Sequence, residues 1–154
     1  YARLRGAPTL ALAGEDDARY PETRRKVEAL HLTDRVRFLG AVREGDLPAL
    51  YSGALAFVFP SRYEGFGFPP LEAMACGTPV ACSDIACLRE TTGDAALHFR
   101  PEEVQSIAAA IERLLDDAAL REDLRARGLR TAAGLSWEQA ARQTLEIYHR
   151  AAGD

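Results

Sequence analysis

The sequence predicts an α/β fold, with a three-layer, doubly wound parallel sheet covered by helices on both faces. Two observations carry this prediction. Short apolar runs alternate with helical stretches over the first two-thirds of the chain, as they do in βαβ units. These runs are continuous rather than alternating with polar residues, which is typical of parallel strands that are buried on both faces.

The expected elements follow one another with short connections. Strands are expected at 9–13, 36–39, 54–59, 79–81 and 96–99, and helices at 22–30 and 47–51. Proline suits the first turn of a helix and glycine its end, so another helix is expected from Pro70 to Gly77. The last third reads as helical, with apolar residues at helical spacing from Val104 to Leu115 and a second helix that ends near Gly128.

A final helix is predicted after Ser136. Ser136 and Gln139 have the spacing of a capping box, in which the serine caps the helix start. The apolar residues that fall on one face of this helix are Trp137, Ala141, Leu145 and Tyr148. Trp137 is expected to pack the helix onto the body of the domain.

Length and composition indicate one soluble domain over residues 1–154. The hydrophobic fraction of 47% is sufficient for a core without disulfides. The net charge of -4 and the scattered basic residues argue against a nucleic-acid partner. An odd count of three cysteines favours reduced thiols, and no apolar run reaches the length of a membrane span, so a cytoplasmic location is expected. The scattered histidines and the Cys82/Cys87 spacing predict no metal site.

The segment at 60–68 is the candidate site, because it follows the most apolar predicted strand. Ligands of open α/β sheets bind at the carboxyl ends of the strands. Its glycines allow backbone N–H groups to approach an anion or a sugar, and the start of the next helix favours negative charge. The segment therefore predicts a site for a phosphorylated or sugar ligand.

Two carboxylates frame this segment, Glu64 and Glu72. Carboxylate oxygens accept hydrogen bonds well, and one carboxylate can take two vicinal hydroxyls of a sugar or ribose. A structural interpretation fits the same residues: Glu72 as an acidic residue of a first helical turn, and Glu64 as a solvated loop residue. Residue chemistry alone leaves both interpretations open.

Residues 62–80, RYEGFGFPPLEAMACGTPV, resemble the signature of the group 1 glycosyltransferases, which are glycosyltransferase family four. The signature is two glutamates separated by seven residues. The similarity extends to 36–40, 47–51 and 136–138, and so covers nearly the whole chain. It implies a Rossmann-like domain, the C-terminal half of a GT-B glycosyltransferase.

The resemblance implies roles for the framing glutamates and the residues between them. Glu64 would bind hydroxyls of the donor sugar as the catalytic-site carboxylate, and Glu72 would hold the nucleotide ribose. Backbone amides would contact the sugar and the diphosphate, and the residues that supply them are Gly65, Phe66, Gly67 and Phe68. The base is expected near Leu39 to Val42, with Gly14 and Glu15 at the border of the pocket.

The implied activity is hexose-type transfer from a nucleotide diphosphate donor, such as GDP-mannose or UDP-glucose, to a hydroxyl acceptor. The family is metal-independent, requires no cofactor and retains the anomeric configuration. The intact enzyme is expected in glycan biosynthesis, with peripheral membrane association. The alternative is a non-catalytic nucleotide-sugar-binding or scaffold module; a nucleotide-sugar epimerase is less favoured. The base, the sugar, the acceptor and the oligomeric state are not determined by the sequence.

The resemblance also makes the chain look like an N-terminally truncated domain without its acceptor domain. Family members bind the diphosphate with an arginine and a lysine after the first strand of this domain. Residues 1–5 resemble the end of the helix that follows that strand, and Lys26 is poorly placed to replace the lysine. Loss of a central strand exposes two inner edges, which predicts a remodelled sheet, self-association or a preceding segment. The chain alone is therefore expected to be inactive.

Overall fold

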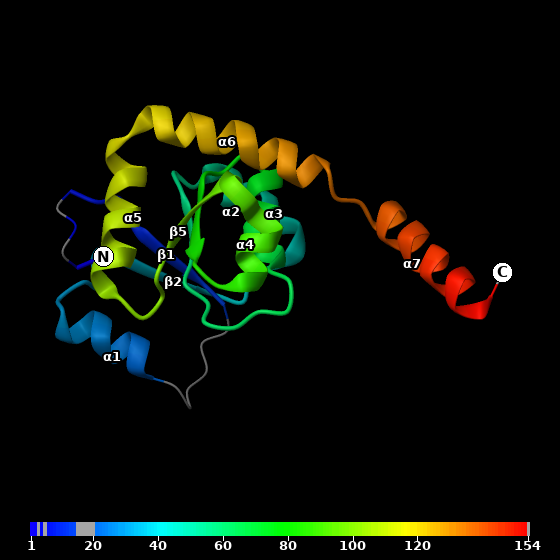
Figure 1. Ribbon diagram of the computed structural model, residues 1–154. Coiled ribbons are helices and arrows are strands. Elements are labelled where there is room, and N and C mark those ends of the chain that lie inside the picture. The colour runs from blue at the N-terminus through cyan, green and yellow to red at the C-terminus, as the bar shows by residue number, and fades with distance from the viewer. Residues whose placement is uncertain (3, 5, 15–20, 154) are drawn as a thin grey trace.

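The computed structural model describes residues 1–2, 4, 6–14 and 21–153 and confirms the α/β class (Figure 1). Within these residues the strands are β1 (Leu10–Ala13), β2 (Val36–Gly40), β3 (Phe57–Phe59), β4 (Val80–Ser83) and β5 (Ala96–Phe99). The α-helices are α1 (Glu22–Ala29), α2 (Leu47–Gly53), α3 (Phe68–Ala75), α4 (Ala86–Thr92), α5 (Val104–Asp116), α6 (Ala118–Ala133) and α7 (Trp137–Ala152). Short 3-10 turns lie at Glu44–Asp46 and Gly93–Ala95.

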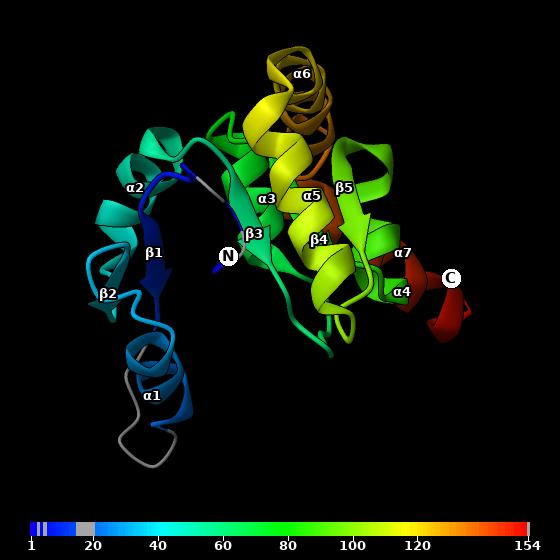
Figure 2. The same ribbon diagram turned by 90° about the vertical axis from the view of Figure 1, so that its left-hand side faces the viewer.

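The strands form two parallel sheets. β1 pairs with β2, with Leu10 opposite Val36, and β4 pairs with β3 on one side and β5 on the other. Within the described residues no hydrogen bonds join β1 to β3, and Figure 2 shows these two strands as the neighbouring edges of the two sheets. Among the described strands, the facing edges of β1 and β3 are therefore unpaired, and the choice between a remodelled sheet, self-association and a preceding segment stays a prediction.

The three-stranded sheet carries the larger part of the core. Every residue of the central strand β4 is buried, and successive side chains point to opposite faces. On one face Val80 and Cys82 pack with Met74 of α3 and Leu88 of α4. On the other face Ala81 packs with residues of α5 and α6. The three predicted layers are thus confirmed in this half of the molecule.

The two-stranded sheet has a much smaller core. Val27 of α1, Leu32 and Val36 of β2 form its buried cluster. β1 alternates between half-buried and exposed residues, whereas β4 is buried throughout. The β1–β2 half therefore covers its apolar surface less completely than the β3–β5 half.

Two expected helix boundaries are wrong, and one helix was not expected. α3 begins at Phe68, so both prolines lie in its first turn. α6 does not end near Gly128 but continues to Ala133. A Cβ atom at Gly128 would lie 3.0 Å from Cγ of Met74, so this glycine allows α6 to approach α3 closely. Tertiary packing therefore overrides the low helix propensity of Gly128. The unexpected helix is α4, which follows β4.

The strand expected at 54–59 is reduced to β3, Phe57–Phe59. Ala54 instead ends α2, and its N–H donates to the carbonyl oxygen of Tyr51 at 3.0 Å. A residue that closes a helix in this way is not available for strand pairing, so the apolar run is divided between a turn and a strand.

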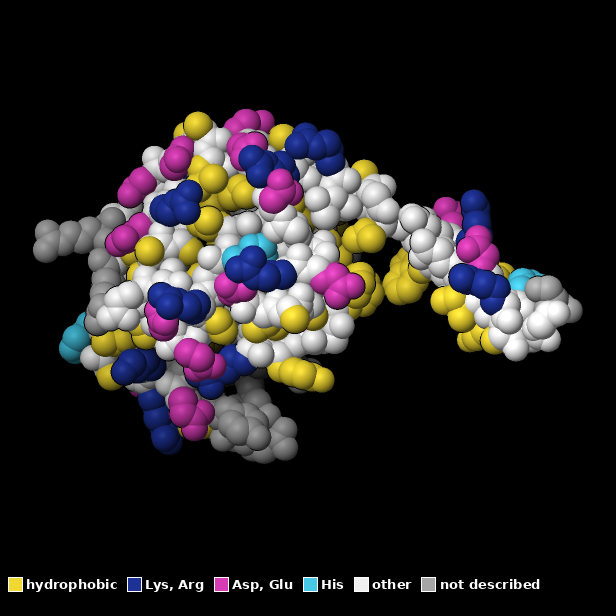
Figure 3. All heavy atoms as spheres, viewed as in Figure 1, with side chains coloured by type: hydrophobic (Ala, Val, Ile, Leu, Met, Phe, Trp, Pro, Cys, Tyr) yellow, Lys and Arg dark blue, Asp and Glu magenta, His cyan; other side chains and the backbone are white. Residues whose placement is uncertain are grey.

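α7 extends away from the domain (Figure 1) and has no buried residue. Ser136 caps it as predicted, since its side chain accepts a hydrogen bond from the N–H of Gln139. Hydrophobic side chains gather along one side of α7 (Figure 3). Trp137 is 77% exposed, so the expected packing of this residue on the domain body is limited to a stack on the ring of Phe68. None of the helices in the described residues combines the length and apolar character that a bilayer crossing requires.

Candidate functional site

The candidate loop, residues 60–67, connects the end of β3 to the start of α3. Gly67 is the N-cap residue of α3 and has a φ of 95°, in the left-handed region that favours glycine. A Cβ atom at this position would also overlap the side chain of Leu88 in α4. Backbone conformation and the close approach of α4 therefore both require glycine here, and the loop turns tightly into the helix.

The backbone N–H groups of this loop are available to a ligand. Pro69 and Pro70 carry no N–H, so Gly67 and Phe68 supply the donors at the start of α3. Within the described part of the chain, the N–H groups of residues 65–68 donate to no backbone carbonyl. Free amides beside a helix N-terminus bind anionic oxygens, and the site thus has the donors that a diphosphate needs.

Glu72 lies on α3 with an exposed side chain and is held by one neighbour. The hydroxyl of Tyr51 in α2 donates to Oε2 of Glu72 at 3.1 Å. Burial, and then the hydrogen bond to Glu72, raise the pKa of Tyr51 to about 12. The phenol is therefore protonated at neutral pH and remains a donor to Glu72. Among the described residues no donor contacts Oε1, which leaves that oxygen for a ligand.

Sequence reasoning did not identify Tyr51 as a functional residue. It lies 21 residues before Glu72, on a different helix, so no local pattern connects the two. The one available signal was chemical, because a buried tyrosine hydroxyl needs a hydrogen-bond partner.

Glu64 is half-buried in the loop. Burial, and then the carboxylates of Glu64 and Glu90, raise the pKa of the Cys87 thiol at the start of α4. Glu64 is thus close to α4, whereas Glu72 contacts α2. The two predicted carboxylates therefore lie against different helices, with the loop amides in the chain segment between them.

Two arginines near the loop are already engaged in ion pairs. Arg62 lies 2.8 Å from Glu102, with both side chains exposed. Arg89 forms two hydrogen bonds with Asp84, which lower the pKa of this carboxyl. Among the described residues, no three His, Cys, Asp or Glu side chains lie together in a way that could hold a metal. The donors of the site are therefore mainly backbone amides.

Exposed aromatic rings cover the start of α3. Phe66 and Phe68 lie with their ring centroids 4.8 Å apart. Phe68 also stacks on Trp137, at 6.0 Å between centroids. This stack is the contact through which the start of α7 reaches the candidate loop.

The loops expected near the base meet at the carboxyl end of the β1–β2 sheet. The N–H of Gly14, after β1, donates to the carbonyl oxygen of Gly40, at the end of β2, at 3.0 Å. Glu15, the other residue expected at this border, lies outside the described residues. The structure thus places Gly14 beside the start of the segment Leu39 to Val42.

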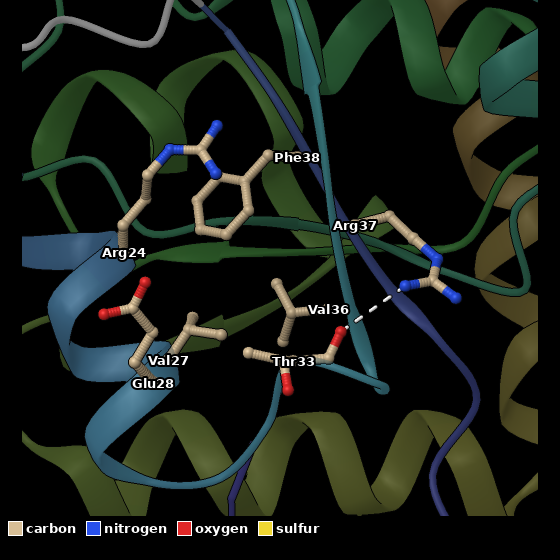
Figure 4. Close-up of a pocket in the computed structure, with 7 residues that line it drawn as sticks. All are labelled: Arg24, Val27, Glu28, Thr33, Val36, Arg37 and Phe38. Atoms are coloured by element: carbon tan, nitrogen blue, oxygen red, sulfur yellow. Dashed lines mark hydrogen bonds between the residues drawn. The ribbon is translucent and has the colours of Figure 1, made fainter.

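A separate hollow of about 290 Å³ lies between α1 and β2 (Figure 4). The guanidinium of Arg24 lies over the ring of Phe38, 4.1 Å from its centroid. The residues that line this hollow are Arg24, Val27, Glu28, Thr33, Val36, Arg37 and Phe38. Because neither Glu64 nor Glu72 is among them, this hollow is distinct from the candidate site.

The fold and the loop together define a Rossmann-like α/β domain in which a glycine turn with free backbone amides follows the carboxyl end of a parallel strand. A family model described as "Glycosyl transferases group 1" matches residues 2–131. The chain belongs to the group 1 glycosyltransferases.

Curated relatives support the same assignment. The chain is 50% identical over 113 residues to the O-antigen chain mannosyltransferase B of Escherichia coli, which covers 73% of this chain and 30% of that protein. It is 36% identical over 151 residues to a glycogen synthase of Mycobacterium tuberculosis, covering 95% of this chain and 36% of that protein. The chain thus spans about a third of the length of these relatives.

Solved structures share the fold. A sucrose-phosphate synthase from Thermosynechococcus elongatus superposes with a TM-score of 0.84 at 33% identity, over 94% of this chain and 39% of that chain. Anabaena Alr3699/HepE, solved in complex with UDP-glucose, superposes with a TM-score of 0.87 at 24% identity, over 97% of this chain and 43% of that chain. The fold is that of the C-terminal, Rossmann-like half of GT-B glycosyltransferases.

Proposed function

We propose that this chain is the donor-binding domain of a retaining, metal-independent glycosyltransferase. The intact enzyme transfers a hexose-type sugar from a nucleotide diphosphate donor to a hydroxyl acceptor. The observation that carries the proposal is the loop at 60–67, whose free amides lie between two carboxylates in the chain. The name of the mannosyltransferase relative supports GDP-mannose as donor, and the UDP-glucose complex of Anabaena Alr3699/HepE supports UDP-glucose.

The proposed roles follow from the chemistry of each group. The amides of residues 65–68 bind the diphosphate and the developing negative charge of the leaving nucleotide. Glu72 accepts hydrogen bonds from the ribose hydroxyls. Glu64 accepts hydrogen bonds from the donor sugar and is the catalytic-site carboxylate. The domain thus contributes orientation and electrostatic stabilisation of the transition state rather than a general base.

We also propose that the intact protein supplies two further parts: an acceptor domain and a strand that pairs with β1 and β3. The greater length of the relatives supports the acceptor domain. The unpaired edges of β1 and β3 support the added strand. Basic side chains for the diphosphate would come with the added strand, because Arg62 and Arg89 are already paired. A cytoplasmic location belongs to the same proposal.

The test is titration calorimetry of the intact protein with UDP-glucose, GDP-mannose, UDP and GDP. We expect either the uridine or the guanosine nucleotides to bind. Glu72→Ala should lower the affinity for the sugar nucleotide and for the free nucleotide alike. Glu64→Ala should lower the affinity for the sugar nucleotide only. Both variants should lose transfer while keeping their unfolding temperature. Full activity in both would show the site assignment to be wrong.

A control and a second outcome complete this experiment. Glu146→Ala removes an exposed carboxylate from the second half of α7, away from the Trp137 contact with the loop, and should leave binding unchanged. Nucleotide binding without transfer to any acceptor would favour the alternative, a non-catalytic binding module.

A further inference from the structure

We propose that Tyr51 is a positioning residue that fixes the Glu72 carboxylate and thereby sets the preference for ribose over 2′-deoxyribose in the donor. This inference rests on the proposed function, in which Glu72 binds the ribose. Tyr51 itself touches no ligand in this scheme, since it acts through Oε2 of Glu72.

The framework around Tyr51 is rigid. Its side chain is 8% exposed, and its ring meets the ring of Phe57 edge-on at 5.3 Å between centroids. The buried hydroxyl of Thr78 donates to the backbone carbonyl oxygen of Tyr51 at 2.7 Å. Both the ring and the backbone are therefore held, so the phenol hydroxyl has a fixed position and direction.

Glu72 needs such a support. Its side chain is exposed on α3, and a free glutamate loses considerable rotamer freedom when it is ordered by a ligand. The hydrogen bond from Tyr51 to Oε2 removes part of this freedom before a ligand arrives. It also fixes the plane of the carboxylate, which leaves Oε1 and the second lone pair of Oε2 as two acceptors in defined directions.

Two acceptors in fixed directions favour two vicinal hydroxyls. A ribose offers the 2′- and 3′-hydroxyls, whereas 2′-deoxyribose offers one. A site built to bind a hydroxyl rejects the analogue that lacks it, because a polar group of the site is then left unpaired. A mobile carboxylate adapts to one hydroxyl and discriminates less, so the Tyr51 hydrogen bond should increase discrimination.

The experiment compares binding of UDP, GDP and their 2′-deoxy counterparts to the intact protein by calorimetry. Tyr51→Phe keeps the ring and removes the hydroxyl. We expect this variant to lower the affinity for the ribonucleotide about three- to tenfold and the affinity for the deoxynucleotide less than about twofold. The KM for the sugar nucleotide should rise by the same factor with kcat nearly unchanged. The matched control is Tyr148→Phe, which removes an exposed hydroxyl from α7 and should leave both affinities unchanged.

A double-mutant comparison makes the test specific. In a Glu72→Ala background, which removes the acceptor of the Tyr51 hydrogen bond, Tyr51→Phe should have no further effect on the ratio of ribo- to deoxynucleotide affinity. Glu72→Gln alone leaves the Tyr51 ring and hydroxyl in place and should itself reduce the ratio, which tests the ribose role of Glu72 separately from the role of Tyr51.

The outcomes separate the two proposals. One outcome is that Tyr51→Phe lowers the affinities for ribo- and deoxynucleotide equally, or changes neither, while Glu72→Gln abolishes the discrimination between them. In that case the role of Tyr51 is refuted and the ribose role of Glu72 stands. If Glu72→Gln leaves both affinities unchanged, the ribose role of Glu72 is wrong and the role of Tyr51 is refuted with it.

Discussion

The two halves of the molecule bury their apolar surfaces to different extents. The three-stranded half has helices on both faces, and Val80 and Leu88 are fully buried there. In the two-stranded half, Val27 and Leu32 remain 9% and 8% exposed. Parallel strands are stable when both faces and both edges are covered, and β4 meets this condition whereas β1 does not. The loop that carries the candidate site belongs to the better packed half.

Truncation of a leucine in each half should give the largest difference in the free energy of unfolding. Leu88→Ala removes a fully buried side chain and should lower the free energy of unfolding by about 4 kcal/mol. Leu32→Ala makes the same chemical change in the two-stranded half and should cost about 2 kcal/mol, because the cavity it leaves can relax. Chemical denaturation of both variants measures the difference. Equal costs would show that the two halves are packed alike.

Gly67→Ala tests the connection between the better packed half and the loop. The new Cβ atom would require a left-handed backbone and would overlap Leu88, so we expect a loss of about 2 kcal/mol in stability and weaker donor binding. Gly65→Ala is the matched control, because a Cβ atom there has no neighbour within 4 Å. It should cost less than about 1 kcal/mol. Similar losses for both would contradict the tight turn at Gly67.

A pH-dependent contribution is expected from His98 in β5. Nε2 of His98 lies 3.0 Å from Oγ1 of Thr92. The Thr92 hydroxyl donates its hydrogen to the carbonyl oxygen of Leu88 at 2.6 Å. In the bond between His98 and Thr92, Nε2 is therefore the donor. Burial, and then the Arg89 charge, lower the pKa of His98. The unfolded state therefore binds more protons, and stability falls as the pH decreases below about 6.5.

His98→Gln should remove this fall below about pH 6.5, as followed by thermal unfolding at several pH values. His149→Gln, on exposed α7, is the control and should leave the pH dependence intact. An unchanged profile in His98→Gln would mean that another group titrates in this range.

Trp137→Ala should have the smallest effect. It removes the stack on Phe68, and because the indole is largely exposed we expect a loss of less than about 1 kcal/mol in stability. Donor affinity should fall slightly, since Phe68 supplies one of the loop amides. Trp137→Phe should restore both quantities. A large loss of stability in Trp137→Ala would show that α7 is anchored through this residue.

The sequence identified the strands better than it identified their surroundings. Continuous apolar runs locate β4 and β5, since all of β4 and both ends of β5 are buried. Ala54 reads as part of a strand but instead closes α2 through a hydrogen bond to Tyr51. Gly128 reads as a helix end, yet it lies inside α6 because Met74 packs against it. α4 was missed because its short apolar pattern is interrupted by polar residues. The error at Gly128 comes from a tertiary contact that a local pattern does not contain, whereas those at Ala54 and α4 come from local signals that resemble another structure.

The candidate site shows the same limit. The glycine-rich loop and both glutamates were identified from one contiguous segment, and their binding roles remain predictions. Local sequence did not reveal that Glu64 lies by α4 and Glu72 by α2, nor that Tyr51 holds Glu72. Each of these depends on how separate helices pack around α3.

The stack between α7 and the loop also gives the domain a built-in optical probe. Trp137 is the single tryptophan of this sequence, and its indole lies one ring away from the residues that precede α3. Any shift of Phe68 when a ligand occupies the loop changes the surroundings of that indole. The fluorescence of the chain should therefore report occupancy of the site directly, without an attached dye.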